Sequence, residues 1–92
     1  MKFKRTLSGD YVATILNKKL LSNSEVAKEI ILSVGKHEGS SKWFATVDYI
    51  VDMGEYGESH RNLSDECGFG EIATKKLAIC YIEQLLAENF TL

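Results

Sequence analysis

The chain has 92 residues, of which 45% are apolar and 26% charged, and its formal net charge is −2. This composition is that of one small globular domain, so we expect a single domain spanning residues 1–92. No stretch approaches the ~18 apolar residues of a membrane helix, and no apolar segment follows the charged start, so we expect a soluble cytoplasmic protein. Cys67 and Cys80 do not follow the spacing of a disulfide scaffold, and we expect both to be free thiols.

The charge is unevenly distributed along the chain. Residues 1–42 carry eight Lys and Arg against four acids, a net charge of +4. Residues 43–92 carry three bases against nine acids, a net charge of −6. This asymmetry predicts either a molecule with one basic and one acidic face, or two halves whose charges interleave in space.

The first sixteen residues are typical of a β-hairpin. Residues 2–7 alternate between apolar and polar side chains, and residues 11–16 are rich in β-branched and aromatic ones. The Ser8-Gly9-Asp10 segment between them has turn chemistry, which predicts a three-residue connection. The alternative is a helix from Ser8 to Leu20.

The next segment allows two interpretations. Ser22 and Glu25 fit a capping box, which predicts a helix over residues 23–35 with Gly35 at its C-terminal end. The alternative is a strand followed by a hairpin loop at residues 37–41. That strand would have these side chains on one face: Val26, Ile30, Leu32 and Val34.

Residues 42–52 form the strongest strand pattern in the chain. One face is wholly apolar and the other mixed, as in a sheet that is packed on one side and partly wet on the other. The apolar face consists of Trp43, Ala45, Val47, Tyr49 and Val51. Residues 53–67 are rich in glycine and charge, which predicts a long loop or a short extra strand.

The run from Gly70 to Asn89 predicts a long C-terminal helix. Its apolar residues recur with the helical period and form one wide stripe: Leu77, Ala78, Tyr81, Ile82, Leu85 and Leu86. We expect Glu71 in the first turn and Cys80 in the core. Together these elements predict an α+β fold, in which a small antiparallel sheet of three to four strands packs against this helix.

No catalytic or metal-binding motif is present in the sequence. The two histidines and two cysteines form no CxxC, HxxxH or CxxH pair, so we expect no metal and no cofactor. His60 is close in sequence to Asp65, Glu66 and Cys67, but a solvated polar loop is the favoured interpretation of that segment. Gly68 to Gly70 with the lysines that follow lacks the spacing of a phosphate-binding loop. We therefore expect a protein that is not an enzyme and has no small-molecule substrate.

Two charged sets are candidate binding surfaces. The basic set can contact phosphates, although it is too small for tight autonomous binding; it comprises Lys2, Lys4, Arg5, Lys18 and Lys19. The acidic set can imitate phosphates or contact the lysines of a partner; it comprises Asp48, Asp52, Glu55, Glu58, Asp65 and Glu66, with Tyr49, Tyr56 and Arg61 interleaved. The alternative is that these acids only keep a small domain soluble.

The ending GFGEIATKKLAICYIEQL loosely resembles the tail of a double-stranded RNA-binding domain, with Lys75 and Lys76 matching that family's lysine pair. The family's element order is α-β-β-β-α. This resemblance makes a small RNA-binding domain an alternative function.

Over its whole length, the chain resembles in style the small phage-encoded anti-CRISPR proteins, most of all those directed at type I complexes. The shared features are one compact α+β domain beginning MKFKRTLSGDYVATIL, split charge, free cysteines and no catalytic constellation. That group has no common motif, so no functional residue is carried across. The resemblance implies a non-catalytic inhibitor in the bacterial host cytoplasm that binds a multi-subunit Cas protein–guide RNA complex. It would block access of guide RNA or target DNA, with direct guide RNA contact as a further expectation. A protein–protein adaptor would have the same appearance.

Overall fold

The computed structural model describes residues 2–63 and 69–91 and has the predicted α+β class. The elements follow one another as β1 (Lys4–Arg5), β2 (Tyr11–Lys19), β3 (Val26–Lys36), β4 (Trp43–Asp52), the 3₁₀ helix η1 (Gly54–Tyr56), β5 (Glu58–Asn62), β6 (Phe69–Ile72) and α1 (Lys75–Asn89). The described residues thus contribute six strands to the sheet, more than the three to four predicted. The order of elements also differs from the α-β-β-β-α order of double-stranded RNA-binding domains, because the described chain begins with a hairpin.

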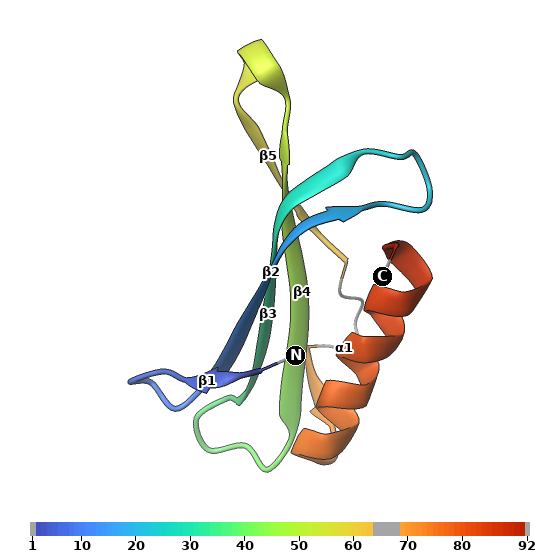
Figure 1. The fold of residues 1–92 in the computed structure, drawn as a ribbon. Coiled ribbons are helices and arrows are strands. Elements are labelled where there is room, and N and C mark those ends of the chain that lie inside the picture. Colours follow the sequence, from blue (N-terminus) through green and yellow to red (C-terminus); the bar gives the residue numbers. More distant parts are fainter. Residues whose placement is uncertain (1, 64–68, 92) are drawn as a thin grey trace.

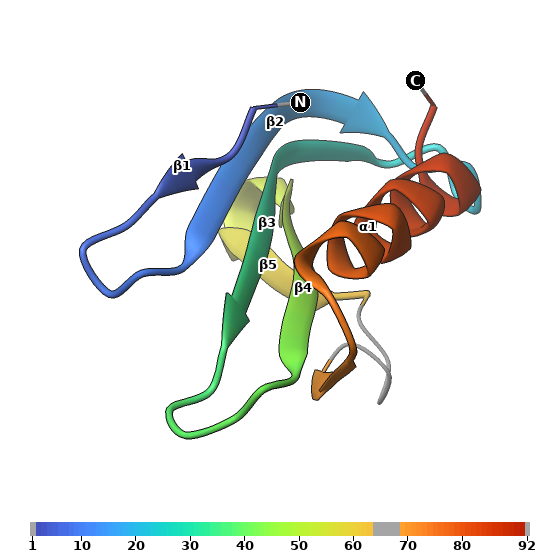
Figure 2. The same cartoon turned by 90° about the horizontal axis from the view of Figure 1, so that it is seen from below.

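The sheet is antiparallel and follows the order β1-β2-β3-β4-β5. β5 pairs with the second half of β4, from Asp48 to Asp52, and β6 pairs with its first residues, Trp43 and Phe44. Helix α1 covers one face of this sheet, and β2 and β3 bend toward it at one end (Figures 1 and 2). Among residues 2–63 and 69–91, no α-helix covers the other face.

The core lies between the sheet and α1. The apolar face predicted for β4 is confirmed, since Ala45, Val47, Tyr49 and Val51 are all buried there and Trp43 packs against them. The remaining buried residues of the core come from β2, β3, α1 and the chain's end: Ala13, Leu20, Ala27, Ile30, Leu32, Val34, Ala78, Ile82, Leu86 and Phe90.

The helix predicted over residues 23–35 is wrong, and the alternative strand is correct. Asn23 and Glu25 use their side chains in a local turn: Asn23 Nδ2 donates to Glu25 Oε1 at 2.6 Å, and Glu25 N donates to Asn23 Oδ1 at 3.0 Å. Ser24 has a φ of 61°, which cannot continue a helix. Gly35 ends no helix, because it lies inside β3 where a Cβ would clash with the Asp10 carboxylate and the Phe44 ring.

A bulge in β3 decides which of its side chains are buried. Lys28 is an extra residue between the pairs that Ala27 and Glu29 make with β4. The extra residue shifts the alternation by one position. Ala27 therefore faces the core together with Ile30, and Val26 is exposed although both interpretations of the sequence placed it on an apolar face.

The N-terminal hairpin is confirmed, and the alternative helix from Ser8 to Leu20 does not form. Its connection runs from Thr6 to Asp10 and is longer than predicted. Thr6 N donates to Asp10 O at 2.7 Å, and Gly9 N donates to Thr6 O at 3.0 Å. Gly9 has a φ of 92°, a conformation that favours glycine.

The C-terminal helix begins at Lys75, five residues later than predicted. Thr74 is its N-cap, with Oγ1 accepting from Leu77 N at 3.1 Å. Glu71 lies in β6 and not in the first helical turn. Cys80 is exposed, so its predicted core position is wrong, and Leu77 is also exposed.

Of the two structures predicted for residues 53–67, the short extra strand is the one that forms over the described part. The chain forms η1 and then returns along β4 as β5. The rest of that segment, residues 64–68, lies outside the described residues, together with the predicted Asp65, Glu66, Cys67 and Gly68 features.

The end of the chain closes the fold. Phe90 forms an isolated bridge with Leu20, so the end of α1 returns to the outer edge of β2. Within the described residues, no helix has both the length and the apolar character needed to span a membrane.

Candidate interaction surface

Two hairpin arms extend from one end of the sheet and diverge (Figure 1). The first arm, residues 18–26, contains the end of β2 and the turn into β3. The second arm, residues 52–58, contains η1 between β4 and β5. β3 and β4 pair no further than Ala27 and Val51, so the two arms separate beyond that pair. We call the two arms and the groove between them the fork.

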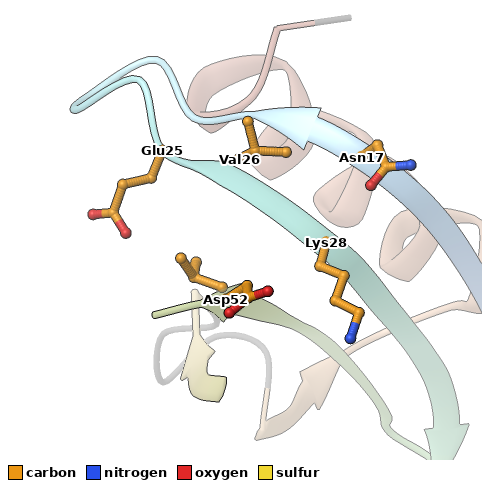
Figure 3. A pocket seen from close by; sticks show the side chains of 6 residues that line it. Asn17, Glu25, Val26, Lys28 and Asp52 are labelled. Carbon is orange, nitrogen blue, oxygen red and sulfur yellow. The ribbon is translucent and has the colours of Figure 1, made fainter. Parts of the chain in front are cut away.

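The groove of the fork has a volume of ≈ 480 Å³ and draws its lining from three strands. The lining residues are Asn17, Glu25, Val26, Lys28, Val51 and Asp52. Figure 3 shows Asp52 on β4 across from Lys28 on β3 and from Glu25 in the turn that precedes β3, with Asn17 on β2. The groove therefore combines valine side chains with charges of both signs.

Exposed apolar side chains gather on the two arms. Among the described residues, seven large apolar side chains are strongly exposed, and four of them belong to the fork. Leu21 and Val26 lie on the first arm, 56% and 50% exposed, and Met53 and Tyr56 on the second, 43% and 88% exposed. Single exposed apolar residues are ordinary, but a group of them at one end of a small domain is typical of a binding site.

Arg61 links the two arms. Its guanidinium donates from Nη1 to Glu25 Oε1 at 3.5 Å on the first arm, and Nη2 lies 4.0 Å from Met53 Sδ on the second. Its Nε also donates to Ser59 Oγ at 3.3 Å. The hydrogen bond to Tyr49 raises the pKa of Arg61 above its ordinary value; partial desolvation opposes this and the Glu25 carboxylate adds to it. Arg61 is therefore a fixed positive charge at the base of the fork.

The acids around the fork have local partners. Lys28 Nζ lies 3.5 Å from Glu58 Oε1, which offsets the repulsion between Glu58 and Asp52, its cross-strand neighbour. Asp52 Oδ1 accepts from Gly54 N at 2.9 Å and so shapes the tip of the second arm. The carboxylates of Glu58 and Asp52 on the rim of the groove are therefore each stabilised by a neighbouring group.

The structure separates the residues predicted as binding sites into two groups. Six of them lie in or beside the fork: Lys18, Lys19, Asp52, Glu55, Glu58 and Arg61. Asp48 lies further along β4, where its Oδ1 accepts from Asn62 Nδ2 at 2.6 Å. Lys2, Lys4 and Arg5 lie at the opposite end of the molecule, since Lys4 pairs with Val12, six residues or ~20 Å along β2 from Lys18. The predicted basic set is therefore not one surface.

Of the apolar members of the fork, the sequence placed only Tyr56 on a candidate surface, interleaved with the acidic set. Val26 is predicted on a buried face, and Leu21 and Met53 follow no periodic pattern. Asn17, inside an otherwise regular strand, was the one signal at this end, because Asn tolerates the left-handed conformation that it adopts here with a φ of 55°.

The described residues offer no assembled metal site, since no three His, Cys, Asp or Glu side chains converge among residues 2–63 and 69–91. His60 is exposed on β5, and the acids and thiol once considered beside it lie outside the described range. Comparison of the chain with protein-family models, curated proteins and solved structures found no match. Function is therefore inferred from the surface.

Proposed function

We propose that the protein is a non-catalytic binding protein that associates stoichiometrically with a protein partner through the fork. The observation that supports this is the grouping of Leu21, Val26, Met53 and Tyr56 around a groove whose rim is charged. An apolar centre enriched in Met and aromatic residues, with a polar rim, is the usual anatomy of a protein–protein interface.

The partner that we propose is a type I CRISPR surveillance complex, a multi-subunit Cas protein–guide RNA assembly in the bacterial cytoplasm. The support for this choice is the resemblance of the whole chain to anti-CRISPR proteins. The fork would hold a Cas subunit, and the bulk of the domain would then block access of guide RNA or target DNA. Inhibition by occupancy needs no substrate, no cofactor and no turnover.

The charged rim would contribute more to the orientation and association rate of the partner than to the affinity of the complex. Rim charges on a protein surface are screened within about 10 Å at 0.1 M salt. Salt should therefore slow association more than it speeds dissociation, which the apolar contacts of Tyr56 and Met53 would control.

The test compares two exposed apolar side chains at opposite ends of the molecule. Tyr56→Ala removes a ring at the tip of the second arm, and Leu7→Ala removes a fully exposed side chain from the β1–β2 connection. Neither residue belongs to the core, so both variants should fold. We expect Tyr56→Ala to weaken binding to purified type I complexes about tenfold or more, and Leu7→Ala to leave it unchanged.

Binding would be measured by surface plasmon resonance on a panel of purified type I complexes, with target-DNA binding by each complex as the functional readout. Binding without loss of DNA capture would favour an adaptor over an inhibitor. If no complex in the panel binds, the proposed partner is wrong. If Tyr56→Ala and Met53→Ala both bind like the wild type, the fork is not the interface.

A further inference from the structure

Cations from four separate segments gather at the end of the molecule opposite the fork. β1, the end of β3, the β3–β4 connection and the start of α1 all lie toward that end (Figure 1). We call this group the basic end: Lys2, Lys4, Arg5, Lys36, Lys42, Lys75 and Lys76. Three carboxylates lie among them, those of Asp10, Glu38 and Glu71, so the described residues give this end an excess of four positive charges. The rest of the described chain carries four cations against eight carboxylates.

A hollow of ≈ 440 Å³ lies beside β1 within the basic end. Its lining contains three cations and two threonines but no carboxylate; it consists of Lys2, Lys4, Arg5, Thr6, Val12, Ala13 and Thr14. Ammonium, guanidinium and hydroxyl groups are the side-chain donors that proteins direct at phosphate oxygens. Within the described residues, none of these three cations forms an ion pair, so their charge is available to a ligand.

Aromatic rings alternate with cations next to this hollow. Lys36 Nζ lies 4.9 Å from the ring centre of Trp43, and Lys75 Nζ lies 3.6 Å from that of Tyr11. Both rings are half-buried and line a second, smaller hollow that also contains Arg5, Lys36 and one carboxylate, that of Asp10. Cations interleaved with aromatic rings are the usual chemistry of single-strand binding, in which phosphates meet the cations and unpaired bases stack on rings.

We propose that the basic end binds single-stranded nucleic acid through its phosphates, at a site separate from the fork. The small hollow accommodates a short stretch of backbone, whereas a duplex would require a longer basic stripe. The proposal extends the proposed function, because a guide RNA could be reached from one end while the fork holds protein. It does not depend on the fork's partner, since it concerns free nucleic acid.

The test measures binding of a fluorescently labelled single-stranded RNA of about 12 nucleotides to the full chain by anisotropy, over a range of NaCl concentrations. Each phosphate contact on a single strand contributes about −0.7 to the slope of log K against log salt. The three cations of the hollow should therefore give a slope of about −2. Lys2→Gln/Lys4→Gln should weaken binding and reduce the slope by about 1.4.

The matched control is Lys18→Gln/Lys19→Gln, which removes the same charge from the fork. It should leave the slope unchanged. An equal loss with both double variants would show attraction to net charge alone and would overturn the site, as would tighter binding of duplex RNA or no binding at the lowest salt. Equal binding of single-stranded DNA would support a site that contacts phosphates. Tyr56→Ala should bind RNA normally, so failure at the basic end and failure at the fork are distinguishable.

Discussion

Asn17 interrupts the alternation of β2, so that side chains on both sides of it can face the core while the strand continues into the fork. Its φ of 55° lies in the left-handed region, which most side chains avoid. On its N-terminal side Ile15 packs against the core, and on its C-terminal side Leu20 is buried, although strict alternation would place these two on opposite faces. Asn17 lies across from the bulge at Lys28, so both strands break their alternation at the same level. The groove of the fork starts there.

Substitution of Asn17 tests this role of the backbone. Asn17→Gly should change the free energy of unfolding by no more than about 0.5 kcal/mol, because glycine adopts positive φ freely. Asn17→Val should lose about 1–2 kcal/mol, because a β-branched residue clashes in the left-handed region. Urea denaturation measures both changes. Thr14→Val, on the exposed side of the same strand, is the control and should show no loss. Equal stability of the glycine and valine variants would mean that residue 17 is not held in this conformation.

Arg61 matters more for geometry than for stability. Its pair with Glu25 is about one-third exposed on each side, and ion pairs that water reaches contribute little to stability because solvent screens them. Arginine stays protonated at every pH that the protein tolerates, and the Tyr49 hydrogen bond raises the pKa of Arg61 further. Deprotonation of Arg61 therefore does not break the link between the two arms.

At the scale of the element, α1 is held by a stripe of three buried residues, which the partly buried Ile79, Tyr81 and Leu85 flank. Ala78, Ile82 and Leu86 are buried at intervals of four residues, while Leu77 beside them is 53% exposed. Ile82→Ala should therefore lower the free energy of unfolding by about 2–5 kcal/mol. Leu77→Ala should change it by no more than about 0.5 kcal/mol. Thermal or urea unfolding of the two variants decides the point, and similar losses in both would mean that the helix is rotated from the position described.

The strand β4 and the body of α1 could be predicted from the sequence, because each has an unbroken pattern. The strand β3 was mistaken for a helix because Ser22 to Glu25 have side chains that suit a helix cap and a turn equally well. β-branched residues in β3 favour the sheet, but pairing with β2 and β4, the strands before and after it in the chain, decides the outcome. Local chemistry could not resolve that choice.

The fork could be predicted only in part. The charges of Asp52 and Glu58 are evident in the sequence, but the exposure of Val26 depends on the bulge at Lys28. Tyr56 becomes the tip of an arm only because β5 returns along β4 after a three-residue 3₁₀ helix. The bulge depends on the pairing of Ala27 with Val51, which is distant in the sequence, and the β4–β5 turn has no periodic pattern, so the exposure of Val26 and Met53 had no local signature.

At the scale of the whole molecule, the difference in charge between residues 1–42 and 43–92 becomes a difference between the basic end and the rest of the molecule. Of the eight cations in residues 1–42, five belong to the basic end, and the other three, Lys18, Lys19 and Lys28, lie at the fork. The start of α1 adds two cations to the basic end. The molecule measures 43 Å along its longest axis, several times the ~8 Å screening length at physiological salt, so the two ends should act on ligands independently.

Residues 89–91 connect the end of α1 to the first arm and to the core, and Phe90 is the central residue of this connection. Its side chain is 2% exposed and meets the Tyr49 ring edge-on, with ring centres 5.6 Å apart. Its backbone neighbours tie the end of α1 to the first arm: Leu21 N donates to Asn89 O at 2.9 Å, and Thr91 N donates to Lys19 O at 2.7 Å. The position of the first arm thus depends on the last residues of the described chain.

Substitution of Phe90 should therefore act on both stability and the fork. Phe90→Ala should lose about 3–5 kcal/mol of unfolding free energy, a large share of what a domain of this size has. Phe90→Leu keeps most of the apolar volume and should remain folded, which makes it the variant to study by amide hydrogen exchange. We expect faster exchange at Leu21 and Thr91 than in the wild type, while amides at the centre of β4 keep their protection, because only the closing bridge is weakened. A uniform loss of protection across β4 and the first arm would contradict this, since it would mean that Phe90 stabilises the core as a whole and does not specifically fix the arm.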